Sequence, residues 1–188
     1  MLTRNSALEL LKEHVTSESL IKHCMAVEGS MRAYASLYNE DVDLWGLTGL
    51  LHDIDFDKHP EEHPMHARKY LKDLDLPESS LTAIEEHGKL DLVTRDTLIS
   101  KSLFAVDSLS SFILAYVHVR PDKSFDDIPL KSIKKKFKDK AFARAVNRDL
   151  ILQGAQDMGL NLDTHMENVI DGIVGWEKEL NNMGLSLV

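Results

Sequence analysis

Apolar residues recur at steps of three and four along most of the chain, and this spacing restricts the protein to helical architectures. Between residues 17 and 38, for example, the spacing selects Leu20, Cys24, Val27 and Met31. Alternation of apolar and polar residues between turn residues, the mark of a half-buried strand, is almost absent. The sequence therefore predicts an all-α fold, a bundle of about seven to nine helices.

The same periodicity predicts where the helices lie. Ser6 and Glu9 have the spacing of a capping box and predict the start of a short first helix. The helices that follow are expected over about 17–38, 42–53, 61–74, 77–88 and 95–119, with two or three shorter ones between 129 and 158 and a last one through 162–180. Gly88 is expected to end the fifth of these helices, which begins near Pro77.

Length and charge limit the class of protein. A chain of 188 residues with 43% hydrophobic residues fits one globular domain over residues 1–188. Its 31 acidic residues exceed its 22 basic residues, which argues against general nucleic-acid binding. No uninterrupted apolar run is long enough to span a membrane. The single cysteine and a start unlike a secretory signal predict a cytoplasmic protein.

Four polar positions interrupt the apolar helix faces. His23 lies on the apolar stripe of its helix, the pair His52-Asp53 ends the least polar stretch, and Asp107 lies between apolar residues. Each position alone is explained as readily by a hydrogen-bonded core histidine or a capped carboxylate. Taken together, buried charges need partners, and one divalent cation would satisfy two imidazoles and two carboxylates. Nitrogen and oxygen ligands without a thiolate suit Fe, Mn, Co, Ni or Mg.

The order of these residues resembles the HD-domain superfamily of metal-dependent phosphohydrolases, and in particular its HDIG-type bacterial group. The resemblance is carried by HCMAVEGSMRAYA around His23, GLTGLLHDID around His52-Asp53, DKHPEEHPMHARKYL, IEEHG, and LFAVDSLSSF around Asp107. It implies a single HD domain with a metal-binding core at about residues 17–120. The basic and C-terminal helices of residues 121–188 would pack on this core.

The resemblance also implies a set of ligands. His23, His52, Asp53 and Asp107 would hold a first metal, and members with two metals add histidines that correspond here to His63 and His87. Asp53 would then bridge both ions. His66 is expected next to the ligands or at the surface, and His59 in a loop. His14 and His165 are expected at the surface, and Cys24 in the core. Asp55 stands where an HDIG element has glycine.

The implied reaction is hydrolysis of a phosphoester of a nucleotide or related small phosphate compound by metal-activated water. Two cations about 3.5–4 Å apart can clamp the ester and neutralise the leaving oxygen. Asp53 and Lys58 are the predicted catalytic residues. Lys58 either contacts a phosphate oxygen or is a solvated surface lysine. Asp57 and Glu62 are nearby acids that the sequence does not rank as proton donors.

The segment 131–148 carries eight bases and one acid. It is either a solvated helix face or a rim that attracts an anionic substrate. In the second interpretation Arg120 and Lys134 are the predicted substrate-binding residues, because a guanidinium can bind phosphate through two hydrogen bonds.

Two other functions use the same residues. A di-iron oxygenase related to the HD fold would have the same types of ligand, and a non-catalytic sensor could bind a phosphorylated ligand without turnover. A cyclic-dinucleotide phosphodiesterase is disfavoured because the Gly-Tyr-Pro motif of that branch is absent from the sequence.

Overall fold

The computed structural model describes residues 2–88 and 94–188, and these residues form nine α-helices and no strand. This confirms the all-α prediction and its range of helix numbers. The helices are α1 (Arg4–His14), α2 (Glu18–Tyr38), α3 (Val42–Leu51), α4 (Ala67–Leu71), α5 (Glu78–His87), α6 (Leu98–His118), α7 (Leu130–Lys138), α8 (Arg148–Asp157) and α9 (Leu162–Asn182).

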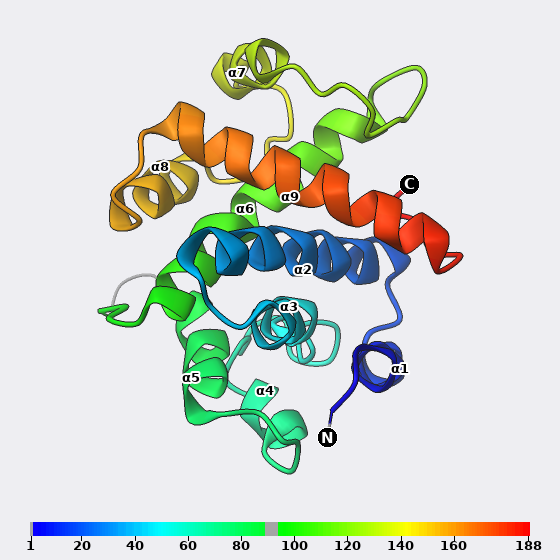
Figure 1. Ribbon diagram of the computed structural model, residues 1–188, viewed down its shortest axis with the longest axis vertical. Helices are drawn as coiled ribbons and strands as arrows, with labels where there is room; N and C mark the ends of the chain where they lie inside the picture. Colours follow the sequence, from blue (N-terminus) through cyan, green and yellow to red (C-terminus); the bar gives the residue numbers. More distant parts are fainter. Residues whose placement is uncertain (1, 89–93) are drawn as a thin grey trace.

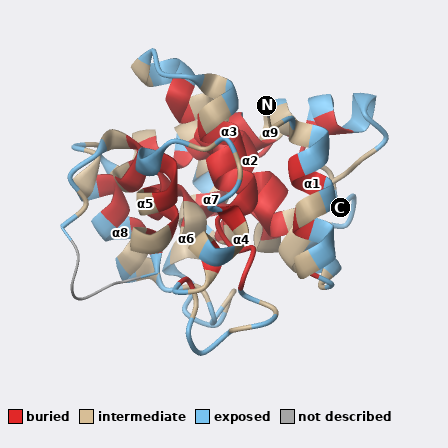
Figure 2. Ribbon diagram, turned by 90° about the horizontal axis from the view of Figure 1, so that it is seen from below, coloured by how far each residue is buried: buried red, intermediate tan, exposed pale blue. Residues whose placement is uncertain are grey.

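Helix α2 lies at the centre of the protein and contacts α3, α6 and α9 (Figure 1). Helices α5 and α8 pack on α6, whereas α7 lies at the edge of the structure. Buried residues concentrate in α2, α3 and α6 (Figure 2), where the largest enclosed side chains include Tyr34, Leu50 and Phe112. The assignment of the whole chain to one domain stays a prediction, although α8 and α9, from the part after residue 120, contact α6.

Most helix ends agree with the sequence pattern. Ser17 caps α2 by accepting a hydrogen bond from the Leu20 amide, and Gly88 is the C-cap of α5. The prediction of a capping box at Ser6 and Glu9 is wrong by three residues. Thr3 is the N-cap, its hydroxyl accepts from the Ser6 amide, and the Thr3 amide donates to the Ser6 hydroxyl.

The segment between α3 and α4 departs most from the prediction. A helix over 61–74 was expected, but α4 covers only Ala67–Leu71 and a series of turns precedes it. Pro64 lacks an amide hydrogen and its ring obstructs the preceding helical turn, so a helix cannot run through it. Asp55 accepts a hydrogen bond from the His66 amide at 2.9 Å, which ties the two ends of the turns together.

Two glycines allow the close helix contacts that position the cavity described below. A Cβ atom at Gly49 would lie 3.0 Å from the Val27 carbonyl oxygen, so glycine lets α3 approach α2. A Cβ atom at Gly154 would lie 2.6 Å from the Ala105 Cα atom, so glycine lets α8 approach α6. Bulkier residues at either position would push these helices apart.

Among the described residues, α6 alone has the length and composition of a membrane-spanning helix. In this protein 67% of its most apolar window is buried against other helices, as in a core helix.

One prediction about the core is confirmed and one is wrong. Cys24 is buried in the core, as expected. His165, expected at the surface, is fully buried in α9. Its Nδ1 pairs with the Tyr34 hydroxyl at 2.5 Å and its Nε2 donates to the Ala105 carbonyl oxygen at 3.0 Å. The two hydrogen bonds satisfy both ring nitrogens, which is why the ring can be buried.

Candidate functional site

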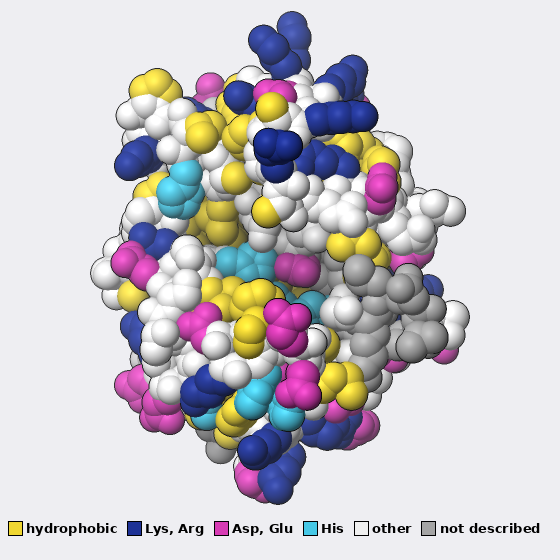
Figure 3. All heavy atoms as spheres, turned by 180° about the vertical axis from the view of Figure 1, so that it is seen from behind, with side chains coloured by type: hydrophobic (Ala, Val, Ile, Leu, Met, Phe, Trp, Pro, Cys, Tyr) yellow, Lys and Arg dark blue, Asp and Glu magenta, His cyan; other side chains and the backbone are white. Residues whose placement is uncertain are grey.

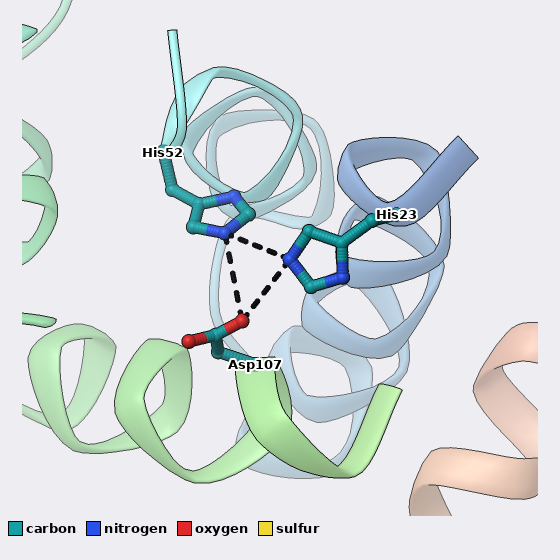
Figure 4. Close-up of side chains that lie close together, drawn as sticks. All are labelled: His23, His52 and Asp107. Atoms are coloured by element: carbon teal, nitrogen blue, oxygen red, sulfur yellow. Dashed lines mark hydrogen bonds and ion pairs between the residues drawn. The ribbon is translucent and has the colours of Figure 1, made fainter. Parts of the chain in front are cut away.

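The first group of candidate ligands comes from three helices that meet at the centre of the fold (Figure 4). His23 lies in α2, His52 is the C-cap of α3, and Asp107 lies in the middle of α6. The His23 Nε2 atom is 3.2 Å from His52 Nε2 and 3.1 Å from Asp107 Oδ1. The structure therefore brings together residues that are far apart in the sequence.

The second group lies beside the first and consists of Asp53, His63 and His87. His87 is the last residue of α5, and His63 lies in the turns before α4. Their Nε2 atoms are 3.0 Å apart, and the His63 Nε2 atom is 3.1 Å from Asp53 Oδ1.

Asp53 lies between the two groups and faces both. Its Oδ2 atom is 3.5 Å from His23 Nε2, while its Oδ1 atom is 3.3 Å from His52 Nε2 and 3.4 Å from His87 Nε2. A carboxylate in this position can bind one ion, or one ion with each oxygen.

The four histidines all turn Nε2 towards the centre because Nδ1 is engaged elsewhere. His52 and His87 donate from Nδ1 to the carbonyl oxygens of Gly49 and Ile84, at 2.7 and 2.6 Å. His63 donates to Asp55 Oδ1 at 2.6 Å, and His23 Nδ1 pairs with the Ser111 hydroxyl at 3.0 Å. Hydrogen bonds of this kind fix the tautomer and the ring orientation of histidines that bind metals.

The electrostatics of the site keep both of its carboxylates ionised. Burial alone would raise the pKa of Asp53, but the charge of His52 and hydrogen bonds with His52, His63 and His87 hold this pKa well below its usual range. Burial likewise opposes ionisation of Asp107, yet hydrogen bonds with His23 and His52 lower its pKa. Two ionised carboxylates in a largely buried site require positive charge close by, which either protonated imidazoles or a metal ion can supply.

The donor set fits a divalent metal. With the hydrogen on Nδ1, the Nε2 lone pairs of neighbouring rings face each other, and this contact is repulsive unless a proton or a metal ion lies between them. Nitrogen ligands bind such ions at about 2.0–2.1 Å, so two of them at right angles on one ion are about 3 Å apart. The two observed Nε2–Nε2 distances are 3.2 and 3.0 Å. The two groups could therefore hold one or two metal ions.

Five of the six clustered residues, all except the fully buried His52, form part of the lining of a cavity of about 740 Å³. It is bordered by the first residues of α2, the turn after α3, the end of α5, the middle of α6 and the start of α8. In Figure 3 the cavity is the hollow at the centre of the face, with histidine and acidic side chains in it and hydrophobic side chains around it. The two groups of candidate ligands are thus accessible to a small molecule through His23, Asp53, His63, His87 and Asp107.

The structure does not bring the three predicted cationic residues to this cavity. Lys58 Nζ lies 2.7 Å from His14 Nδ1, because the turn after α3 directs it towards α1. Arg120 pairs with Asp122 through two hydrogen bonds at the far end of α6. Lys134 pairs with Asp163 at 2.5 Å. Each side chain has another partner, and none is among the described residues that line the cavity.

Sequence reasoning missed two residues that contact the ligands. In the sequence, Asp55 stood out only because it replaces the glycine of an HDIG element. In the structure it is buried and accepts a hydrogen bond from His63. Ser111, which pairs with His23, was not singled out. The sequence did contain a signal for Asp55: it is a second carboxylate, two residues after Asp53, in a segment that follows a strongly apolar helix. Ser111 gave no such signal, since serine is common in helices.

Other candidate metal-binding side chains differ from this set. His59 and His66 stack with ring centroids 3.9 Å apart next to Glu62, and parallel rings cannot both direct a lone pair at one ion. Cys24 lies next to His52 and Asp53, and burial raises the pKa of its thiol.

Comparison with known proteins identifies one related family. Residues 20–111 match the HD domain, and this stretch contains all six clustered candidate ligands. No curated protein and no solved structure matches the chain.

Proposed function

Since the match over residues 20–111 supports membership of the HD-domain superfamily, we propose that this protein is a metal-dependent phosphohydrolase. Its substrate is a phosphoester of a nucleotide or a related small phosphate compound. Within the superfamily, our proposal is that it belongs to the HDIG-type group. This chain differs from the HDIG element in having Asp55 in place of glycine.

The observation that carries this proposal is the convergence of four imidazole Nε2 atoms on Asp53 and Asp107 at one end of a cavity. Bound metal ions would supply Lewis-acid stabilisation of the phosphoryl oxygens and a water of lowered pKa. The six ligands are His23, His52, Asp53, His63, His87 and Asp107. Fe, Mn, Co, Ni and Mg all fit a set of nitrogen and oxygen ligands.

The protein's own residues define how a substrate would lie. The cavity leaves one side of the ligand set open, so a phosphoryl group enters from that side. Asp57 borders the cavity but accepts hydrogen bonds from the Thr16 and Ser17 amides at 2.7 and 3.0 Å. Burial opposes its ionisation, yet these hydrogen bonds lower its pKa. Asp57 therefore remains a carboxylate and is a poor proton donor. Glu62 pairs with His66 and is not among the described residues of the cavity wall.

The test is metal analysis followed by a phosphoester screen. Protein purified without added metal should contain one or two equivalents of a transition metal or take up Mn²⁺. It should hydrolyse at least one phosphoester in the screen. His52→Gln and Asp53→Asn should lose metal and at least 100-fold in kcat/KM. His118→Gln is the matched control, because His118 bonds the Leu114 carbonyl oxygen away from the site.

Metal retention in both variants would contradict the assigned ligands. Oxygen consumption by the ferrous protein, without phosphoester hydrolysis, would replace the proposal with the oxygenase function.

A further inference from the structure

Apart from the clustered candidate ligands, the walls of the cavity are largely apolar. Leu20 from α2, Phe104 from α6 and Leu150 from α8 border it, together with Phe56 and Val146 from the adjoining turns. Walls of this kind are typical of sites that bind the organic part of a small molecule, with a few polar groups to orient it.

Phe56 is the most exposed of these apolar residues. Although its neighbours Ile54 and Asp55 are buried, 40% of Phe56 is accessible. Its ring meets the His63 ring edge-on, with centroids 5.1 Å apart. An aromatic ring exposed next to the ligands leaves a surface on which another ring can pack, an arrangement that stabilises aromatic pairs.

Apart from the clustered candidate ligands, the polar part of the wall is uncharged or acidic. The acidic group is the carboxylate of Asp57, and the uncharged groups are the hydroxyls and the amide of Ser17, Ser19, Ser108, Ser111 and Asn147. Among the described residues that border the cavity, every ionisable side chain is an imidazole or a carboxylate. In Figure 3 the visible Lys and Arg side chains lie towards the top, the bottom and the left edge of the face, outside the central hollow.

This distribution limits the charge of a substrate. One phosphoryl group can be neutralised at the ligand set, where cations would bind. Among the described residues that border the cavity, a second anionic group would meet apolar side chains, uncharged hydroxyl and amide groups, or the carboxylate of Asp57, none of which carries the positive charge that a buried anion needs. The two predicted substrate-binding cations, Arg120 and Lys134, pair with Asp122 and Asp163.

From these observations we propose that the substrate is a phosphate monoester of an uncharged alcohol that carries an aromatic ring system. This inference rests on the proposed phosphohydrolase function and narrows its substrate. Water attacks phosphorus, the ester P–O bond breaks, and the alcohol leaves with a proton from that water, giving inorganic phosphate. A cavity of about 740 Å³ has room for a phosphoryl group and a nucleoside-sized ring system.

The first experiment compares substrates in the Mn²⁺-loaded protein. We expect kcat/KM for 2-naphthyl phosphate to exceed that for ethyl phosphate at least tenfold. The kcat/KM for a nucleoside 5′-monophosphate should exceed the kcat/KM for the corresponding di- and triphosphates by a similar factor. Binding is measured separately by calorimetry with naphthylmethylphosphonate and methylphosphonate, which are not hydrolysed.

Two pairs of variants test the walls. Phe56→Ala should lower the preference for naphthylmethylphosphonate over methylphosphonate about fivefold, whereas Leu37→Ala, an exposed leucine on α2, should leave it unchanged. Leu150→Arg, which adds a cation to the wall, should shift the preference from monophosphate towards diphosphate. Leu152→Arg on the exposed face of α8 is its control.

The outcomes separate the two proposals. Turnover that favours triphosphates, or that treats ethyl and naphthyl esters alike, overturns this inference and leaves the phosphohydrolase function intact. Absence of hydrolysis for every ester tested overturns the function, and this inference with it. An unchanged binding preference in Phe56→Ala excludes Phe56 as the ring-binding surface and overturns the aromatic part of the inference.

Discussion

Hydrogen bonds to Nδ1 determine which nitrogen of each clustered histidine faces the cavity. For His52 and His87 the acceptor is a backbone carbonyl three residues earlier, so the local helix itself fixes the ring. For His63 the acceptor is the side chain of Asp55, which also receives the His66 amide. Burial alone would lower the pKa of His63, but hydrogen bonds with Asp53 and Asp55 raise it to about 9. Asp55 is thus a positioning residue for the second ligand group.

At this scale we predict the effect of Asp55→Asn on metal binding. The amide keeps the size of the side chain but loses its charge, so His63 becomes a weaker and less ordered ligand. The affinity for the second equivalent of Mn²⁺, measured by calorimetry, should fall about 10- to 100-fold while the first changes little. Asp57→Asn is the control, because Asp57 contacts Thr16 and Ser17 and no clustered ligand. Equal effects of the two substitutions would remove the positioning role of Asp55.

Helices α2, α6 and α9 are joined by one buried histidine. His165 in α9 contacts the Tyr34 hydroxyl of α2 and the Ala105 carbonyl oxygen of α6. Burial lowers the pKa of His165 to about 4, against the weaker opposing effect of the Ala105 carbonyl oxygen. The neutral ring is therefore part of the contact that holds α9 against the two helices that carry His23 and Asp107.

This contact predicts how stability depends on pH. In the unfolded chain His165 is protonated below about pH 6.5, whereas in the folded protein it is protonated only below about pH 4. The unfolded state therefore binds more protons between these two pH values. Stability from this group is complete above about pH 6.5 and is lost as the pH falls towards 4. Between pH 7.5 and 5 the loss is about 2 kcal/mol. Urea unfolding at pH 7.5 and 5 measures the free energy of unfolding, which should fall by this additional amount in the wild type relative to His165→Gln. An identical pH dependence of this free energy in both proteins would refute the role of His165.

For the molecule as a whole, the candidate ligands connect parts of the chain that pack in different places. They come from α2, the turn after α3, the turns before α4, the end of α5 and the middle of α6. An ion held by these groups binds the folded chain and not the unfolded one, because the unfolded chain does not bring the ligands together. Metal binding therefore contributes to global stability by mass action.

Removal of metal should accordingly lower the melting temperature. At a free metal concentration 100 times Kd the stabilisation is about 2.7 kcal/mol, or about 5–10 °C for a chain of this size. Thermal unfolding after dialysis against a chelator, and again after addition of Mn²⁺, measures this shift. Asp107→Asn should reduce the shift and His118→Gln should keep it. A wild-type melting temperature that is the same with and without metal would show that no ion binds the folded chain.

The sequence by itself determined the helices and the ligand candidates. Helical spacing is a local property, so the periodicity of apolar residues predicted most of the described helices to within a few residues. The exceptions are the short α4, and α7 and α8, for which the sequence predicted only two or three helices between residues 129 and 158. The six candidate ligands could be named because buried imidazoles and carboxylates need partners, and because their order resembles a known family. All six lie together in the structure, in two groups.

Only the tertiary structure decided which side chains contact one another across helices. Asp55 holding His63, and His165 between three helices, depend on packing that no spacing along the chain reports. Arg120 and Lys134 were expected at the substrate because of their charge, but nearby carboxylates pair with them first. Long cationic side chains reach many partners, and a sequence does not say which of them is closest once the chain has folded.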